Sequence, residues 1–473
     1  MRILFIIPNL SGDFQKAMHP HIGVGYMVAM LKKHNHNSEA IDLRIESKLK
    51  SLDKKVRFFN PEIIGTTFMT RDYKKAYKFV NFLKQRYKRK IIIGGPHPSL
   101  FQEETLKGCN ADYAIVGEGE YAILALANKE PPKKIKNLIW KDGEKIIKNK
   151  TEVIDNLDAL PFPAYDKNSL KKYVDKKIPL VTSRGCPFSC VYCSIKNVMG
   201  KKWRPRSAEN IIEEIENWKA NGYNFFHIAD DNFALDRERV KKVCNLLIGK
   251  KLNINWDLRN GIRADTVDEE LLRLMKKAGC EYVSYGIESV DQEVLDASKK
   301  GLKVETIEKA VYASLKVGIR TGASFIIGLP KDNFTKFNKL LRFINKYNFE
   351  EALIYNCVPY PKTELEIWIK KNGRYLSSPE EYLNYASYWQ NKVLFETPEF
   401  SAAERTKAFQ IAETVVWKKL LRKELGYLLS TIAYPFWINP TLRKAFIKPG
   451  LALWVVLRKI RGKKKYYTQN GQA

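Results

Sequence analysis

The sequence predicts an α/β protein in which a doubly wound domain is followed by a partial barrel of six β/α units and a helical C-terminal region. Two observations predict this class. Strand-length apolar runs alternate with helical patterns in two separate series, and the proline-rich stretch "LDALPFPAYD" (157–166) lies between them. The chain has 473 residues and is 45% hydrophobic, which is enough for more than one core. The predicted boundaries are residues 1–130 for the first domain, 131–174 for a linker, 175–365 for the barrel and 366–473 for the helical region.

The first series predicts the doubly wound, Rossmann-like domain. The apolar run "RILFIIP" (2–8) precedes a helical pattern at 23–36, and another helical pattern occupies 71–87. Three further β-branched runs end in Gly, Thr, His or Glu, and they are residues 62–68, 90–97 and 111–120. Strands that alternate with helices pair in parallel, and a ligand of such a sheet binds beyond their carboxyl ends.

The second series predicts a TIM-type barrel that is not fully closed. Its six apolar runs are residues 178–185, 223–230, 254–265, 281–289, 320–330 and 350–361, and helical segments such as 207–222 fill the gaps. In barrels of this kind the functional side chains lie at the carboxyl ends of the strands and in the loops that follow them.

The composition narrows the choice of compartment and partners. The formal net charge of +30 suits nucleic acid, anionic lipid or acidic substrates. Lysines outnumber arginines and are spread along helical patterns such as 74–90, which favours an ordinary solvated face. The seven cysteines are an odd and sparse set, and the opening residues lack a signal-peptide pattern. We therefore expect a reducing, cytoplasmic location.

Three of the seven cysteines lie close together in "SRGCPFSCVYC" (183–193), in the loop after the first barrel strand; they are Cys186, Cys190 and Cys193. Closely spaced thiolates hold zinc or an iron–sulfur cluster. Structural zinc normally takes four protein ligands, and no second cysteine pair or nearby histidine pair follows. Three cysteines on a cubane cluster leave one iron open for chemistry. The remaining cysteines are expected to be ordinary packing residues; they are Cys109, Cys244, Cys280 and Cys357.

This cysteine spacing, with Tyr192 directly before the last cysteine, resembles the signature of the radical S-adenosylmethionine enzymes. The resemblance implies a 4Fe–4S cluster whose open iron chelates the amino and carboxylate groups of S-adenosylmethionine. It implies that the reduced cluster cleaves this molecule to a 5′-deoxyadenosyl radical. It also implies an electron donor such as flavodoxin or ferredoxin.

Later strand ends resemble the same family in the expected order. In "HIADDNF" (227–233), Asp230 and Asp231 match the groups that bind the methionyl amine, where an ionised acceptor strengthens the hydrogen bond. Arg263 and Glu288 match contacts to the carboxylate and ribose, and Gly328 in "FIIGLP" (325–330) matches the strand that passes close to adenine. The alternative for each charged residue alone is an ion pair in the barrel mouth.

The amino-terminal domain resembles the cobalamin-binding domain that is fused to this barrel in one large subfamily. The matching strand ends are "GTT" (65–67), "GGPH" (94–97) and "GEGE" (117–120), and the implied cofactor-binding residues are Thr66, Thr67, Gly94, Gly95, His97, Gly117, Glu118, Gly119 and Glu120. Glycines allow the backbone to approach a bulky ligand, and threonine hydroxyls can bond its amide arms. A generic nucleotide-binding domain is the rival, but the first turn lacks the Gly-x-Gly-x-x-Gly pattern.

One departure concerns the cobalt ligand. The Asp-x-His-x-x-Gly motif, through which many cobalamin proteins supply a lower histidine ligand, is absent from the chain. The position of His97 resembles a wall of the corrin site. The resemblance therefore implies cobalamin without histidine ligation, with the lower face of cobalt open or water-bound.

The resemblance implies methyl transfer to an unreactive carbon or to phosphorus, through the 5′-deoxyadenosyl radical and methylcobalamin. The alternative is cyclisation or rearrangement, as in the anaerobic cyclase that builds the fifth ring of chlorophylls. An RNA methylthiotransferase would carry three more cysteines in the amino-terminal domain, which has only Cys109, so nucleic acid is not expected as a partner. A non-enzymatic cobalamin carrier would not need the cysteine triad.

The C-terminal tail lies outside the resemblance. From Lys418 to Lys465 it holds 13 Lys or Arg against one acid, Glu424, and residues 424–467 mix these with aromatic and apolar residues. Its apolar runs are too short for a transmembrane helix, which needs roughly 20 residues. Two interpretations stay open. The tail contacts anionic membrane, which would favour a lipid-like substrate, or it is a helical cap and the substrate is another small molecule.

Overall fold

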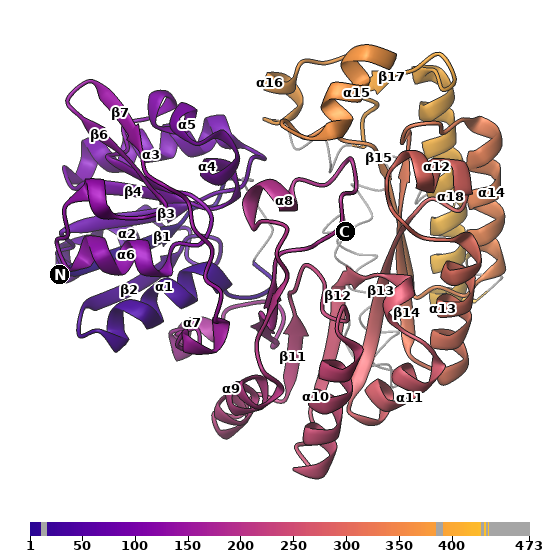
Figure 1. Ribbon diagram of the computed structural model, residues 1–473, viewed down its shortest axis with the longest axis horizontal. Coiled ribbons are helices and arrows are strands. Elements are labelled where there is room, and N and C mark those ends of the chain that lie inside the picture. Colours follow the sequence, from indigo (N-terminus) through magenta and orange to yellow (C-terminus); the bar gives the residue numbers. More distant parts are fainter. Residues whose placement is uncertain (11–16, 385–390, 427–429, 432–433, 435–473) are drawn as a thin grey trace.

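The structure is a computed structural model that describes residues 1–10, 17–384, 391–426, 430, 431 and 434. The N-terminal domain is built on a seven-stranded sheet of order β2-β1-β3-β4-β5-β6-β7 (Figure 1). Its first five strands are parallel, and they are β1 (Arg2–Ile7), β2 (Asn37–Asp42), β3 (Ile63–Thr67), β4 (Lys90–Gly94) and β5 (Tyr113–Ile115). The predicted parallel domain is confirmed.

Helices cover both faces of this sheet because its strands are apolar on both sides. In β1, Leu4 faces one core and Phe5 faces the other. The helices α2 (Leu49–Phe59) and α3 (Tyr73–Tyr87) pack on the first core, and α1 (Ile22–Lys33) and α6 (Glu120–Ala127) pack on the second. The short helices α4 (Pro96–Phe101) and α5 (Glu103–Gly108) follow β4.

The segment 131–174, predicted as a linker, contributes two strands to the first sheet. The strands β6 (Leu138–Asp142) and β7 (Lys145–Lys148) form an antiparallel hairpin, and β6 pairs with β5. Leu138 and Ile139 are fully buried, so the hairpin belongs to the domain core. Asp142-Gly143 is the turn signal that the sequence analysis missed, and Gly143 has a φ of +58°. The remaining segment holds α7 (Lys167–Leu170) and irregular chain.

The second domain is an open barrel of six parallel strands in the order β15-β14-β13-β12-β11-β8. The strands are β8 (Ile178–Leu180), β11 (Phe225–Ile228), β12 (Asn255–Ile262), β13 (Cys280–Glu288), β14 (Arg320–Ile327) and β15 (Glu351–Asn356). Its helices are α9 (Ala208–Ala220), α10 (Arg237–Gly249), α11 (Glu269–Lys277), α12 (Gln292–Ala297), α13 (Val304–Val317) and α14 (Phe334–Lys346). β8 and β15 are the two edges, so the prediction of an incompletely closed barrel is confirmed.

Side-chain caps explain where several barrel helices begin. Ser207, Asp236 and Asp268 each accept a hydrogen bond from a backbone N–H in the first turn of α9, α10 and α11. These helices fix the spacing between strands, and the strand ends that carry the predicted site residues therefore meet at one rim.

A short antiparallel ribbon interrupts the barrel after β8. β9 (Ser183–Arg184) pairs with β10 (Arg204–Pro205), with Arg184 directly opposite Arg204. The ribbon encloses residues 185–203, which we call the cysteine loop, and this loop contains α8 (Ile195–Val198). Figure 1 shows α8 between the two domains, and the cysteine loop is therefore held at their interface.

The C-terminal region is largely helical, as predicted, with a small strand pair. It contains α15 (Glu364–Asn372), β16 (Arg374–Tyr375), α16 (Pro379–Tyr382), β17 (Phe395–Glu396) and α18 (Ala402–Leu425). α18 begins at a capping box formed by Ser401 and Glu404, and it lies against β15 and α14. None of the described helices is long and apolar enough to cross a membrane. The basic stretch 435–473, to which the predicted membrane contact belongs, lies outside the described residues.

Candidate functional site

The backbone conformation at the start of the cysteine loop is set by Gly185. Gly185, directly before Cys186, has a φ of +81°, and a Cβ there would lie 2.4 Å from the carbonyl oxygen of Lys202. Only glycine lets the two sides of the loop approach this closely. Within the loop, the N–H of Val191 donates to the carbonyl of Ser298, at 3.1 Å. The cysteines are therefore presented by a backbone that is anchored to the barrel.

The three thiols share one environment. Burial raises the pKa of Cys193 to about 11 and also raises that of Cys186, and the thiol of Cys190 and the carboxylate of Asp231 act in the same direction. No three His, Cys, Asp or Glu side chains in the described ranges meet closely enough to hold a single metal ion. A cubane is larger than one ion and takes one thiolate at each of three corners, so the donor set fits a cluster. Cluster binding must then release the thiol protons.

The other cysteines are buried, as the packing interpretation predicts. The thiol of Cys109 donates to the carbonyl of Thr105, and burial raises the pKa of Cys244 and Cys357 to about 12. A neutral, buried thiol is a small hydrophobic group. We assign these cysteines no role in the site.

Asp230 and Asp231, predicted as a pair, have different surroundings. Asp230 is buried and accepts hydrogen bonds of 2.6 Å from the N–H and hydroxyl of Thr182 and from the hydroxyl of Ser183. It therefore joins the end of β11 to the end of β8. Asp231 is exposed and accepts one bond of 3.1 Å from the N–H of Gly185. Of the two aspartates, Asp231 is therefore the one whose carboxylate is open to solvent.

A buried lysine that the sequence analysis missed connects two predicted residues. The Nζ of Lys300 lies 3.2 Å from the carboxylate of Glu288 and 3.2 Å from the hydroxyl of Tyr192. Lys300 is only 6% exposed and Glu288 8%. The network ties β13 to the cysteine loop, and it leaves the second oxygen of Glu288 for a ligand hydroxyl.

Arg263 is engaged by the protein itself. Its guanidinium donates to both oxygens of Asp265, at 3.0 and 2.8 Å, and to the carbonyl of Lys300, at 2.8 Å. Its Cζ lies 3.5 Å from the ring centroid of Phe188, in the cysteine loop. Arg263 thus contacts the cysteine loop through a cation–π contact. The predicted contact with a ligand carboxylate stays a prediction.

Gly328 also has a partner within the chain. It has a φ of +90°, and a Cβ there would lie 2.5 Å from a guanidinium nitrogen of Arg405. Arg405 comes from α18, is 2% exposed, and donates to the carbonyls of Phe395 and Phe400. The absence of a side chain at Gly328 therefore makes room for Arg405. The predicted approach of adenine to this strand stays a prediction.

The carboxyl edge of the first sheet offers polar groups without partners. The hydroxyl of Thr66, at the end of β3, is buried and accepts or donates no hydrogen bond within the described residues. A Cβ at Gly94 would have only the carbonyl of Ile115 nearby, at 3.8 Å. Gly95 is different, because a Cβ there would lie 2.5 Å from the hydroxyl of Thr67 and 2.9 Å from the carbonyl of Phe68. Gly94 borders open space, and Gly95 is needed by the turn.

His97 lies in a cluster of aromatic rings directly after β4, and its predicted role as a wall of the corrin site stays a prediction. Its Nε2 lies 2.8 Å from the hydroxyl of Tyr77, and its ring centroid lies 5.0 Å from that of Tyr73 and 4.5 Å from that of Phe101. Burial, assisted by the charge of Lys362, lowers the pKa of His97 to about 3. Its Nδ1 is buried without a partner in the described chain. Unpaired donors and acceptors at this edge suit the amide arms of a corrin.

Glu118 and Glu120 have partners that the sequence analysis did not predict. Arg184 donates to Glu118 at 2.7 Å and to Glu120 at 2.6 Å, and Arg204 donates to the other oxygen of Glu118. Burial lowers the pKa of Arg184, but the carboxylates of Glu120 and Glu118 outweigh this effect and raise it. Glu118 and Glu120 therefore form interdomain ion pairs, because a buried carboxylate requires a partner charge. Their predicted contacts with cobalamin stay a prediction.

The two glycines of the same motif shape the turn. Gly117 has a φ of +67°, and its N–H donates to the hydroxyl of Ser99 at 2.9 Å. A Cβ at Gly119 would lie 2.9 Å from the side chain of Ile115. Both glycines serve the local backbone, and neither is shown to border a ligand.

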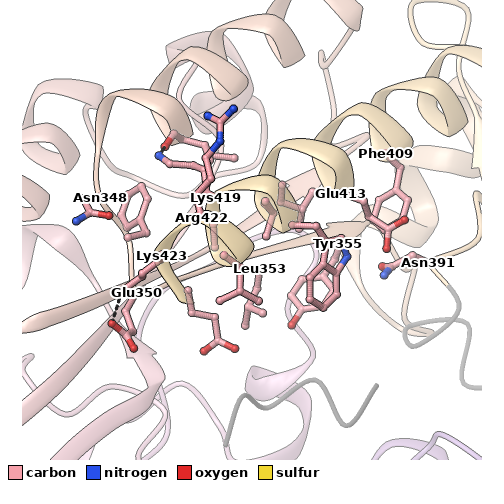
Figure 2. A pocket seen from close by; sticks show the side chains of 18 residues that line it. Asn348, Glu350, Leu353, Tyr355, Asn391, Phe409, Glu413, Lys419, Arg422 and Lys423 are labelled. Atoms are coloured by element: carbon pink, nitrogen blue, oxygen red, sulfur yellow. Dashed lines mark hydrogen bonds and ion pairs between the residues drawn. The ribbon is translucent and has the colours of Figure 1, made fainter. Parts of the chain in front are cut away.

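A cavity of about 500 Å³ lies away from these residues, between β15 and α18 (Figure 2). Its lining combines apolar and aromatic groups such as Leu353, Tyr355 and Phe409 with charged ones such as Glu350 and Lys423, which form an ion pair. No residue of the predicted site lines it. It opens at the edge strand of the barrel.

Two family models match the chain. The radical SAM superfamily model matches residues 180–344, and the B12 binding domain model matches residues 15–127. The first match contains the cysteine loop and strands β11 to β14, and the second contains strands β2 to β5 of the first sheet.

The relatives share most of their length with this chain. An uncharacterized methyltransferase of Pyrococcus horikoshii is 28% identical over 87% of this chain and 91% of its own. The anaerobic magnesium-protoporphyrin IX monomethyl ester cyclase of Rubrivivax gelatinosus is 27% identical over 77% of this chain and 69% of its own. The radical S-adenosylmethionine methyltransferase TsrM of Kitasatospora setae, solved with cobalamin and a 4Fe–4S cluster, is 15% identical over 88% of each chain, with a TM-score of 0.70. Another structure of that enzyme holds a tryptophan substrate.

Proposed function

The chain belongs to the cobalamin-dependent radical S-adenosylmethionine enzymes, and we propose that it transfers a methyl group to an unreactive carbon of a small-molecule substrate. The observation that carries the proposal is the position of the cysteine loop. It presents three thiols and α8 at the interface with the domain whose carboxyl edge suits a corrin. Both cofactors thus belong to one interdomain site.

The chain's own residues have separate tasks in this site. When bound, the cluster supplies the electron that cleaves S-adenosylmethionine, and cobalamin supplies the methyl group. Cys186, Cys190 and Cys193 ligate the cluster. Asp231 accepts hydrogen bonds from the methionyl ammonium, and Glu288, oriented by Lys300, accepts one from a ribose hydroxyl. Of the three thiols, that of Cys190 is buried, and those of Cys186 and Cys193 are half-buried.

Thr66, Thr67 and the space beside Gly94 hold the amide arms of the corrin, and His97 forms a wall of its site. Nε2 of His97 is bonded to the hydroxyl of Tyr77 inside an aromatic cluster, so this nitrogen would not be available as a metal ligand. A flavodoxin or ferredoxin is the expected electron donor in a reducing cytoplasm.

Methyl transfer is tested most directly on the cofactor, before any substrate is known. Protein loaded with both cofactors is incubated without oxygen with a chemical reductant, which supplies cob(I)alamin, and with S-adenosylmethionine that carries a deuterated methyl group. We expect the label on the bound cobalamin and, once the cluster is reduced, release of 5′-deoxyadenosine. Cys190→Ala, which removes a cluster ligand, should lose the deoxyadenosine. Label that never reaches cobalamin would contradict methyl transfer.

Cyclisation is the second candidate, and the likeness to the anaerobic cyclase of Rubrivivax gelatinosus is the observation that favours it. A cyclase would release deoxyadenosine without moving the label. The same experiment therefore separates the two functions.

The basic tail supports a further part of the proposal, in which the enzyme contacts anionic membrane and takes a lipid-like substrate. Each basic residue near an anionic surface contributes about 1 kcal/mol. Flotation with vesicles of mixed neutral and anionic lipid tests it. Binding should require the anionic lipid, weaken in high salt and disappear when residues 424–473 are deleted. Full-length protein that never floats at low salt would leave the tail as a helical cap.

A further inference from the structure

Four buried charged side chains join the base of the cysteine loop to the N-terminal domain. We call Glu118, Glu120, Arg184 and Arg204 the interdomain charge cluster. None of the four side chains is more than 6% exposed. Two carboxylates face two guanidinium groups, so the cluster is neutral as a whole, which buried charges require.

The cluster holds both ends of the cysteine loop at once. Arg184 is the last residue before the loop and Arg204 the first after it, and the two lie opposite each other in the β9–β10 ribbon. One carboxylate, that of Glu118, accepts from Arg184 on one oxygen and from Arg204 on the other. A single side chain of the N-terminal domain therefore closes the loop at its base.

The arginines of the interdomain charge cluster form hydrogen bonds with defined directions. Arg184 donates its two terminal nitrogens to two different carboxylates, at 2.7 and 2.6 Å, and its Cζ lies 5.0 Å from the ring centroid of Tyr26. Arg204 also donates to the carbonyl of Ile154, at 2.6 Å. Planar guanidinium forks fix distance and orientation together, which an apolar contact of equal area would not do.

The turn that carries Glu118 also contacts the wall of the corrin site. The N–H of Gly117 donates to Ser99, which lies in α4 two residues after His97. On its other side, a Cβ at Gly117 would lie 3.8 Å from the carbonyl of Val198 in α8. Residues 117–120 thus connect the corrin wall to the cysteine loop within one turn.

We infer that Glu118, Arg184 and Arg204 are positioning residues that fix the cysteine loop, and with it the cluster, relative to the corrin. This role depends on the two cofactors and not on whether the reaction is methyl transfer or cyclisation. It also explains why charges are used at an interface that apolar residues could bury without a desolvation cost.

The test compares the wild type with Glu118→Gln, which keeps the shape of the side chain and removes its charge. Both proteins are loaded with the cluster and cobalamin, without substrate. The first readout is the spin relaxation of cob(II)alamin with the cluster reduced and oxidised, because the reduced cluster speeds relaxation over short distances. We expect Glu118→Gln to bind both cofactors and to lose at least half of this enhancement. The second readout is hydrogen exchange of residues 185–203, expected to rise at least tenfold.

Two further variants make the result specific. Asp155 forms an ion pair of 2.6 Å with Lys202 of the cysteine loop, and the two side chains are 68% and 65% exposed, respectively. Asp155→Asn breaks this exposed pair and should change neither readout. Arg184→Lys keeps the charge but cannot span both carboxylates, so it should give an intermediate loss, and it decides the matter if Glu118→Gln does not fold. Unchanged relaxation and exchange in the folded variants would overturn the inference. Loss of cobalamin with unchanged exchange would overturn it too, and would return Glu118 to the corrin site.

Discussion

The state of His97 can be tested through the pH dependence of stability. His97 is 1% exposed, inside a cluster of aromatic rings, and burial lowers its pKa to about 3. The unfolded chain takes up a proton near the ordinary histidine pKa of about 6.5. The folded protein cannot take up that proton until the pH falls to about 3, so acid favours unfolding. The contribution of His97 to stability is present above pH 6.5 and is lost as the pH falls toward 3.

The expected magnitude follows from the two pKa values. Between pH 7 and pH 5, His97 is protonated in the unfolded chain but neutral in the folded protein over about 1.5 pH units. At about 1.4 kcal/mol per unit this is about 2 kcal/mol, or a change of about 30-fold in the opening equilibrium. Removing the titrating ring should abolish this share of the pH dependence.

The assay is amide hydrogen exchange of β4 in full-length protein without cofactors, corrected for the intrinsic rate at each pH. His97→Phe keeps an aromatic ring among Tyr73, Tyr77 and Phe101, and it removes the titration. The contributions of groups that are unchanged by the substitution cancel in the difference between the two proteins. If the wild type and His97→Phe lose exchange protection equally between pH 7 and pH 5, the assignment of a buried neutral histidine is refuted.

Three further predictions concern the cofactors and the C-terminal region. Cys190→Ala should lose cluster iron and deoxyadenosine release while it binds hydroxocobalamin as the wild type does, and retained iron would contradict the ligand set. Gly94→Leu should weaken cobalamin binding at least tenfold with unchanged iron content, because its side chain enters open space, whereas Gly249→Leu, also in open space but on α10, should leave both unchanged. Gly328→Ala should cost about 1–2 kcal/mol from its left-handed backbone and loosen α18 by displacing Arg405. Its affinity for S-adenosylmethionine should not change, and a large loss of that affinity would place adenine at Gly328 after all.

The sequence predicts the parallel strands well because their signal is strong and local. A strand buried on both faces is a continuous apolar run, as in β1 and β4, and the flanking helices have a clear period. β2 was missed because it is an edge strand with one exposed face, and "NSEAID" carries few apolar residues. The β6–β7 hairpin was hidden by the charged residues that surround its Asp-Gly turn.

The site is predictable only in part, for a related reason. A motif at a strand end shows which edge of the sheet it occupies, and this places the cysteines, Thr66 and Asp231 correctly at their rims. The motif does not show which side chains from other segments of the chain contact it. Lys300 and Arg405 reach their partners from segments that carry no motif. The signal that could have revealed Arg184 is its position directly before the glycine of the cysteine motif.

The buried charges around the cysteine loop follow one rule. Asp230 holds Ser183 at its entrance, Arg263 holds Phe188 inside it, and Lys300 holds Tyr192 near its last cysteine. The interdomain charge cluster holds both ends of the loop. Each of these charges is paired by the protein before any ligand arrives, because an unpaired charge at such burial would be expensive. A residue that binds a ligand must keep an oxygen or nitrogen that can still form a hydrogen bond. Of the two predicted aspartates, this favours the exposed Asp231 over Asp230, which already accepts several hydrogen bonds.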